Sequence, residues 1–291
     1  MSADLLTLDA AKRILEISTN QDDDILRLLI ASASGMVEQY TGRSFAPLWQ
    51  TRRYDASGDH ITAKTLGVGQ DLLEVSVLTN GDDTVIDAAD LLLVPYDEYP
   101  KRAITIKASS TAEFTYNTDW QAAISVQGVW GYHEAWESAW VSTLDAVQDD
   151  ALGAGSATIT VSNSAGVDAR GIAPRFEVLG YYRIDNEVVQ VTNVTVTEAT
   201  EEDPAIHTLT VTRGALGTTA AEHAQGAAIT RYLPMQDIEL GATSLLSWLY
   251  RNKAKLGDRY QFLGGEHPVL NEAPKLILTT LNPYRRLRVG E

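Results

Sequence analysis

Apolar residues near the N-terminus recur at helical spacing, which predicts two amphipathic helices. The first is expected to begin after the N-cap candidate Thr7, with its apolar stripe at Leu8, Ala11, Ile14 and Leu15. The second is expected between Asn20 and Gly42, and it carries at helical spacing Ile25, Leu28, Leu29, Ser32, Met36 and Tyr40. The three aspartates at residues 22–24 open this helix, and we interpret them as a solvated cap that matches the helix dipole rather than as a metal site.

From Phe45 to Tyr132 the pattern changes to short extended runs, which predict a small antiparallel sheet. The runs lie at residues 49–54, 72–78, 91–94, 103–107, 112–116 and 122–130. Residues 80–83, Asn-Gly-Asp-Asp, are a strong turn signal between two of them. Trp136, Trp140 and Leu144 then recur at intervals of four, so residues 133–149 are predicted to form a helix.

Residues 151–232 differ in composition and pattern from the rest of the chain: they are rich in Gly, Ser and Thr, and β-branched positions alternate with polar ones. Extended runs at residues 157–161, 187–192, 209–213 and 227–230 predict a compact all-β module. Residues 198–204 are acidic and flanked by threonine, which is typical of an exposed hairpin tip or loop.

A helical pattern resumes after Pro234, with apolar positions at Ile238, Ala242, Leu245, Leu246 and Leu249. Gly257 is expected to end this helix, and a last helix is expected from about Asn271, with Pro274 in its first turn. The helix that begins after Pro234 is the element expected to follow the strand that ends at Trp130-Gly131-Tyr132. We therefore expect an α+β fold: a discontinuous helical-bundle domain with a small antiparallel sheet, residues 1–149 and 233–291, that accepts an inserted all-β domain at residues 150–232.

Composition limits the classes of function. The chain has 291 residues, 44% of them hydrophobic, no cysteine and a formal net charge of −16, so disulfides and cysteine-based metal sites are excluded. The acidic balance argues against a protein that grips nucleic acid, although an acidic wall suits DNA that slides past as well as it suits solubility. No apolar run reaches the length of a membrane span and the N-terminus lacks a signal peptide, so we expect synthesis in a cytosol and no membrane contact.

No catalytic constellation is visible in the sequence. A nucleophile elbow, a P-loop and a complete dinucleotide fingerprint are absent, and the five histidines are scattered without a metal-binding spacing. We therefore expect no enzymatic activity, no catalytic residue, no bound metal and no cofactor. Carbohydrate binding by the β module is an alternative, but all six tryptophans lie outside residues 150–232 and are interpreted as core and interface aromatics.

In order along the chain, residues 6–12, 24–33, 37–45, 129–132, 248–253 and 282–286 resemble the siphophage head-to-tail connector, or adaptor, proteins. The resemblance covers roughly residues 5–132 and 234–289, and the β module is a departure from it. Residues 212–227 resemble a module that recurs in phage tail and baseplate proteins. The resemblance implies a structural virion protein made in the host cytoplasm and located in the neck. It implies a homo-oligomeric ring, commonly of twelve copies, that docks on the portal protein and receives a stopper or tail-completion protein while double-stranded DNA passes without specific binding.

The resemblance also implies that the C-terminal segment docks on the portal, which assigns portal binding to Tyr284, Arg285, Arg286 and Arg288. The alternative is that these arginines complement the last helix dipole or touch DNA. The segment after Gly42 is a candidate for subunit contacts through Arg43, Phe45 and Trp49, and closure of the bundle core by Phe45 and Trp49 is an equal alternative. A competing function is a phage tail-associated carbohydrate- or receptor-binding protein that acts through residues 150–232.

Overall fold

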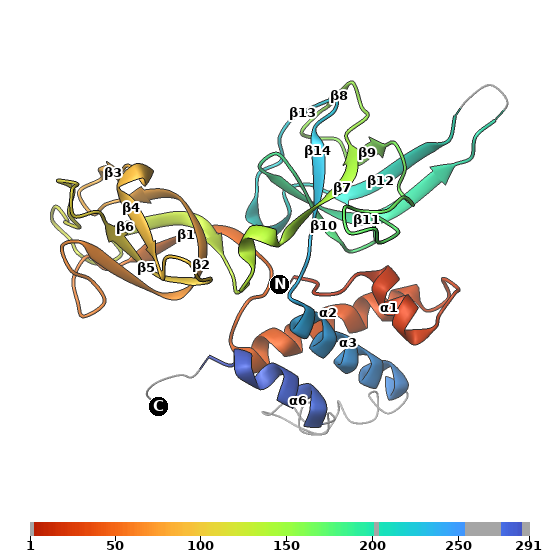
Figure 1. The fold of residues 1–291 in the computed structure, drawn as a ribbon, viewed down its shortest axis with the longest axis horizontal. Coiled ribbons are helices and arrows are strands. Elements are labelled where there is room, and N and C mark those ends of the chain that lie inside the picture. The colour runs from red at the N-terminus through yellow and green to blue at the C-terminus, as the bar shows by residue number, and fades with distance from the viewer. Residues whose placement is uncertain (1–2, 201–203, 254–274, 287–291) are drawn as a thin grey trace. The chain divides into compact units, whose positions relative to one another are not determined.

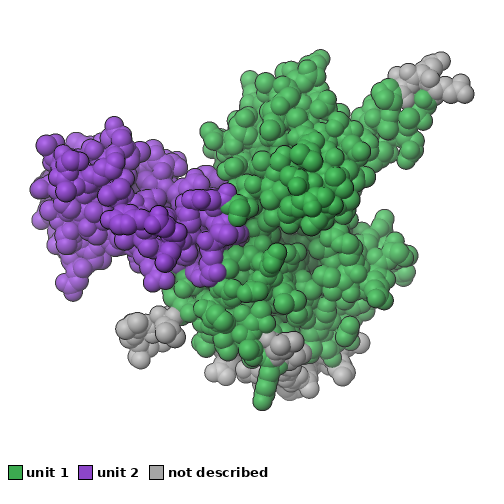
Figure 2. Space-filling view, viewed as in Figure 1, with its two compact units in different colours: residues 1–43, 138–291 green, residues 44–137 purple. Residues whose placement is uncertain are grey.

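The computed structural model describes residues 3–200, 204–253 and 275–286. They form two compact units: unit 1 comprises residues 1–43 and 138–291, and unit 2 comprises residues 44–137 (Figure 2). Unit 1 contains the α-helices and an antiparallel sheet, whereas unit 2 is built around a second antiparallel sheet. The fold class is therefore α+β, as the sequence predicts.

Four α-helices of the described residues pack against one another in unit 1: α1 (Leu8–Leu15), α2 (Asp23–Thr41), α3 (Gln236–Arg251) and α6 (Lys275–Leu281) (Figure 1). α3 packs against both α2 and α6. Ile30 of α2, Leu245 of α3 and Leu281 of α6 are fully buried. A Cβ on Gly241 would lie 2.8 Å from the Leu281 side chain, so α6 approaches α3 as closely as it does because this position is glycine.

The predicted ends of the first two helices are confirmed. The Thr7 hydroxyl accepts a hydrogen bond from the Ala10 N–H at 3.1 Å, which caps α1. Gly42 ends α2 in the left-handed conformation at φ 68°. Asp22 accepts a hydrogen bond from the Tyr250 hydroxyl and lies 3.5 Å from Lys253 Nζ, so it links α2 to α3.

The sheet of unit 2 has the strand order β1-β6-β2-β5-β4, with β3 pairing β2. Its strands are β1 (Leu48–Tyr54), β2 (Thr65–Thr79), β3 (Val85–Ile86), β4 (Leu91–Val94), β5 (Lys101–Ile106) and β6 (Ile124–Trp130), and the short 3-10 helix η1 (Ala88–Asp90) precedes β4. Leu66, Ile104, Val126 and Trp130 are among the buried residues of its core.

The prediction of a strand at residues 112–116 is wrong. Of these residues, Tyr116 alone makes a β-bridge, an isolated one to Gly81. The Asn80 side chain replaces the missing ladder, because its amide donates to the Glu113 carbonyl at 2.8 Å and its oxygen accepts from the Thr115 N–H at 3.2 Å. A side chain that satisfies backbone groups in this way lets an apolar segment pack without joining the sheet.

The sheet of unit 1, which we call the module sheet, has the strand order β7-β14-β10-β11-β12-β9, all antiparallel. Its strands are β7 (Trp140–Ala146), β9 (Thr158–Val161), β10 (Tyr181–Ile184), β11 (Glu187–Thr197), β12 (Ile206–Thr212) and β14 (Ala228–Tyr232). β8 (Ala151–Leu152) pairs with β13 (His223–Ala224), and the 3-10 helix η3 (Ala215–Gly217) follows β12. The long β11–β12 hairpin projects from the module (Figure 1).

The prediction of a helix at residues 133–149 is wrong. The 3-10 helix η2 (Trp136–Ser138) is followed directly by β7, whose Trp140 is opposite Tyr232 of β14. The fully buried Thr143 hydroxyl donates to the Ile229 carbonyl at 2.7 Å. Pairing with a strand that is distant in sequence therefore overrides the helical spacing of the apolar residues. The module sheet extends to residue 140, upstream of the predicted boundary, and the insertion itself stays a prediction.

Several sequence predictions concern residues outside the described ranges. They are the helix end at Gly257, the helix start near Asn271 with Pro274, the residue Arg288, and part of the acidic tip at residues 198–204. Among the helices of the described residues, none is both long and apolar enough to cross a bilayer.

Candidate functional site

The predicted docking residue Tyr284 anchors the C-terminal segment to the helices of unit 1. It ends the 3-10 helix η4 (Asn282–Tyr284), is 7% exposed, and its hydroxyl donates to Asp237 Oδ2 of α3 at 2.9 Å. Arg43 Nε donates to the Tyr284 carbonyl at 2.7 Å, and the Arg286 N–H donates to the Thr41 carbonyl at 2.7 Å. The start of the segment is therefore fixed against the C-terminal end of α2.

Arg285, the next residue, is exposed. Its guanidinium carbon lies 5.1 Å from the centre of the Tyr40 ring, and the Tyr40 hydroxyl donates to Asn282. No carboxylate of the described residues lies within ion-pair distance of Arg285. Arg286 is partly exposed. The structure thus brings together three of the four predicted docking residues, with one as the anchor and two at the surface, while Arg288 lies outside the described residues.

The three predicted subunit-contact residues divide between the units. Arg43 belongs to unit 1 and binds the Tyr284 carbonyl, whereas Phe45 and Trp49 belong to unit 2. Phe45 is buried, and its ring meets the edge of the Tyr132 ring with the centroids 6.0 Å apart. Trp49 is half-buried in β1 opposite Val129. Burial favours the reading of Phe45 as a packing residue rather than a surface contact.

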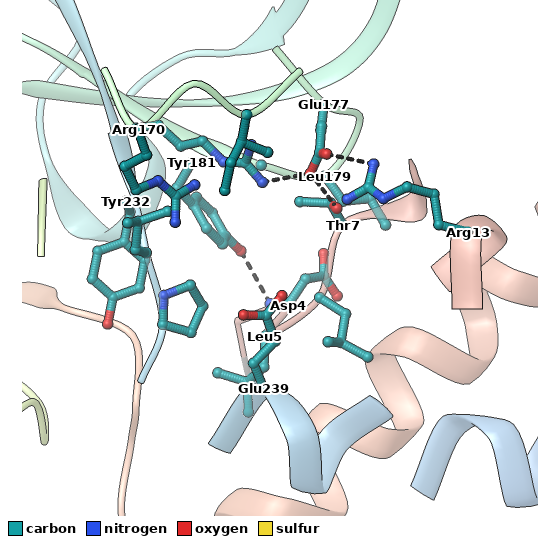
Figure 3. Close-up of a pocket in the computed structure, with 16 residues that line it drawn as sticks. Asp4, Leu5, Thr7, Arg13, Arg170, Glu177, Leu179, Tyr181, Tyr232 and Glu239 are labelled. Carbon is teal, nitrogen blue, oxygen red and sulfur yellow. Dashed lines mark hydrogen bonds and ion pairs between the residues drawn. The ribbon is translucent and has the colours of Figure 1, made fainter. Parts of the chain in front are cut away.

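A second polar site joins α1 to the module sheet, and it centres on the fully buried Glu177. Its carboxylate accepts hydrogen bonds from the Thr7 hydroxyl at 2.6 Å, from Arg13 Nη1 at 2.7 Å, and from Arg231 Nη2 (Figure 3). The Leu8 N–H donates to the Val178 carbonyl and Asp9 accepts from the Val178 N–H, at 2.9 and 2.8 Å. Sequence reasoning missed this site, because its members lie in three distant parts of the chain and no motif links them.

A cavity of about 170 Å³ adjoins this buried carboxylate (Figure 3). Its walls come from residues 4–7, from α1, from the segment before β10, from β14 and from the first turn of α3. Its charged lining is Asp4, Arg13, Arg170, Glu177, Arg231 and Glu239. Burial raises the pKa of the Asp4 carboxyl, although Gln190 and Arg27 act to lower it. Burial also raises the pKa of Glu239, against the lowering effect of Arg231.

A third buried cluster surrounds Glu187 on the module sheet. Arg213 donates to both of its carboxylate oxygens at 2.7 Å, and His223 bridges it to Asp185. Burial acts to raise the pKa of Glu187, but hydrogen bonds from Arg213 and from the Ala221 and Gly214 N–H groups lower it to about 2. The arrangement of Asp185, His223 and Glu187 differs from a nucleophile paired with its base, because the hydrogen-bond partners of both His223 ring nitrogens are carboxylates.

Within the described residues, no group of three or more His, Cys, Asp or Glu side chains could hold a metal ion. In unit 1, α1 is joined to the module sheet by the Arg13–Glu177 ion pair and the Thr7–Glu177 hydrogen bond, and the start of the basic C-terminal segment is anchored at the end of α2.

Residues 5–71 match the model of the phage gp6-like head-tail connector protein family. This range contains α1, α2, β1 and the start of β2, and it confirms the predicted resemblance over these residues. No match was found among curated proteins or among solved structures. The family is one of structural phage proteins, so the match supports a structural connector role, contacts with phage head and tail components, and a place in the virion neck. The resemblance of residues 212–227 to tail and baseplate modules stays a prediction.

Proposed function

We propose that the protein is a head-tail connector subunit that assembles as a ring beneath the portal protein and joins the capsid to the tail or to a stopper. The observation that carries this proposal is the family match over α1 and α2. The C-terminal segment is bonded to the end of α2, and the start of α1 is bonded to Glu177 beside the module sheet. Double-stranded DNA passes through the ring. If about twelve copies each carry a net charge of −16, the ring repels DNA rather than holding it.

In this proposal the C-terminal segment docks on the portal. Tyr284 fixes the segment in place, and Arg285, Arg286 and Arg288 meet an acidic portal surface. The support is the contrast within the segment, where a buried tyrosine bonded to Asp237 is followed by an exposed arginine without a carboxylate partner among the described residues. Cations at the rim of an interface steer association and set its dependence on salt. Arg43, Phe45 and Trp49 stay the proposed region of subunit contact, with Phe45 as a buried support.

Charge reversal of Arg285 tests the docking surface. We expect Arg285→Glu to weaken binding to the purified portal by about tenfold or more at low salt, because each copy then presents a repelling charge. Light scattering after size-exclusion chromatography gives the mass of the protein alone and with portal, and titration gives the affinity. The wild-type protein is expected to form a discrete ring on the portal.

The matched control is Arg251→Glu, because Arg251 is an exposed arginine in the last turn of α3. It should bind the portal like the wild-type protein. Equal weakening by both substitutions would show a general effect of charge and would remove Arg285 from the docking surface. A wild-type protein that stays monomeric in the presence of portal would overturn the connector ring itself.

A further inference from the structure

The outer half of the β11–β12 hairpin has a sheet edge that no strand of the described residues covers (Figure 1). β10 pairs with β11 only as far as Gln190, and the Leu179 and Gly180 backbones then bind Val191. Residues 193–197 pair with β12 on one side, and no backbone hydrogen bond links their other side to another segment of the described chain. This stretch, which we call the open edge, therefore presents a row of unpaired backbone N–H and C=O groups.

The open edge lacks the features by which proteins keep an exposed strand from pairing. Its sequence, Asn-Val-Thr-Val-Thr, has no charge, no proline and no glycine, and four of its five residues are β-branched. The bulge of β11 falls at Thr192, before the open edge begins, and Val196 within it is 40% exposed. An uncharged, β-branched edge of this kind is a template for a further strand.

We propose that the open edge pairs antiparallel with the open edge of a second copy of this chain, about a two-fold axis at Thr195. The side chains are self-complementary in this register, because Thr195 lies opposite Thr195 of the second copy and Val194 opposite Val196 of the second copy. Facing β-branched side chains stabilise a strand pair. A shift of one residue would place each valine opposite a polar side chain, so the sequence also sets the register.

The charges at the two ends of the open edge are complementary in the same register. Glu198 follows the open edge and lies beside Thr192 of the second copy, and the Thr192 carbonyl accepts a hydrogen bond from Arg27 Nη2 at 3.2 Å. Arg27 is partly exposed and makes no ion pair within the described residues. A parallel pairing would instead bring together two copies of residues 198–203, each with four carboxylates.

The length of the pairing is limited to the open edge, because Val191 is already bonded to Leu179 and Gly180. A contact of this size is small, so we expect a dimer that dissociates on dilution. The contact is isologous, which joins copies two by two and closes no ring. The proposal therefore goes beyond the connector role and does not rest on it.

Disulfide formation tests the contact directly, because the chain contains no cysteine and a single introduced thiol reports on it. Thr195→Cys places two thiols opposite each other across the proposed axis, within the reach of a disulfide. Mild oxidation of this variant should give a covalent dimer on a non-reducing gel. Thr158→Cys is the matched control, because Thr158 is an exposed threonine on β9, away from the open edge, and this variant should stay monomeric on the gel.

Sedimentation equilibrium measures the contact without a cross-link, and the wild-type protein should show a monomer–dimer equilibrium. Thr195→Lys puts like charges opposite each other and should weaken the dimer by about tenfold or more, whereas Thr158→Lys should leave it unchanged. Arg27→Glu and Glu198→Arg should each weaken it by about threefold to tenfold, and the two together should restore most of the affinity. Within one chain Glu198 lies about 20 Å along the strand from Thr192, so this recovery reports a contact between copies.

Three outcomes would overturn the proposal: a wild-type protein that stays monomeric at every concentration, a dimer that survives Thr195→Lys, or equal cross-linking of the two cysteine variants. Circular dichroism of each variant shows whether a loss of the dimer is a loss of fold, and the cross-link of Thr195→Cys decides the question if a charged variant does not fold. Because none of these measurements uses the portal, their failure leaves the proposed connector role untouched.

Discussion

The two six-stranded sheets of this chain bury their polar groups in different ways. In unit 2 two buried polar side chains bind backbone: Lys101 Nζ donates to the carbonyls of Pro95 and Tyr96 at 2.9 and 2.7 Å, and Asn80 binds Glu113 and Thr115. On the module sheet buried carboxylates bind backbone N–H groups and also pair with arginines, as in the pair of Glu187 with Arg213. The apolar cores are otherwise alike in their aliphatic and aromatic content.

This difference predicts different sensitivities. Removal of a buried side chain that binds backbone leaves neutral backbone groups unpaired, whereas removal of one member of a buried ion pair leaves a charged group unpaired, which costs more. The stabilisation by a buried ion pair also depends on pH, because the carboxylate must stay ionised to bind the arginine. We therefore expect the module sheet to be the more easily broken of the two, by substitution and by acid.

The largest expected effect is that of Glu187→Ala. It leaves the buried Arg213 without its carboxylate, which should destabilise the module sheet by about 3–5 kcal/mol. The matched substitution in unit 2 is Glu113→Ala, whose partner Lys64 is 3.9 Å away and whose side chain is 60% exposed, so the expected change is within about 1 kcal/mol. Amide hydrogen exchange of β10–β12 measures the loss of stability in Glu187→Ala, and that of β2 and β5 measures it in Glu113→Ala. Equal losses of stability in the two variants would refute the expected difference between the sheets.

Acidification should act next most strongly. The pKa of Glu187 is lowered from 4.5 to about 2, so its contribution to stability is fully present above pH 4.5 and is lost as the pH falls through that interval toward 2. Hydrogen bonds also lower the pKa of Asp145 and Asp168 against the effect of burial, which adds to the same acid sensitivity of unit 1. Exchange protection of the module sheet is expected to decline before that of unit 2, and Glu187→Gln should flatten this decline. Simultaneous loss in both sheets would count against the ion pairs as the cause.

The smallest expected effect tests the feature that the sheets share. Ile104 of unit 2 and Ile159 of the module are both 0% exposed, so Ile104→Val and Ile159→Val should each cost about 0.5–1.5 kcal/mol in their own sheet. Local exchange measurements should show the loss confined to the substituted unit. A clearly larger loss for one of the two would show that the apolar cores also differ.

The sequence predicted the parts whose signals are local. Thr7 caps the start of α1 and Gly42 ends α2, and both positions were predictable because a helix cap depends only on the neighbouring backbone. The position of α3 was predictable from its apolar stripe. The same spacing rule failed at β7, where Trp136 and Trp140 have helical intervals but Trp140 pairs with Tyr232. It failed again at residues 112–116, because the Asn80 side chain satisfies the backbone that a strand would pair.

At the candidate sites, the order of short motifs along the chain was enough to indicate a connector-like protein, and the family match over residues 5–71 confirms that resemblance. The basic C-terminal segment was also visible as residues 284–288, but its anchor was not, since Tyr284 meets Asp237 and Arg43 only in the folded unit. Helix ends, the apolar stripe of α3 and charge runs are thus determined by the sequence alone, because they arise from residues a few positions apart. The stripe of α2 is not, since Leu28 is 64% exposed whereas Leu26 and Ile30 are fully buried. The clusters around Glu177 and Glu187 are decided by the tertiary structure, because burial and distant partners give these side chains their chemistry.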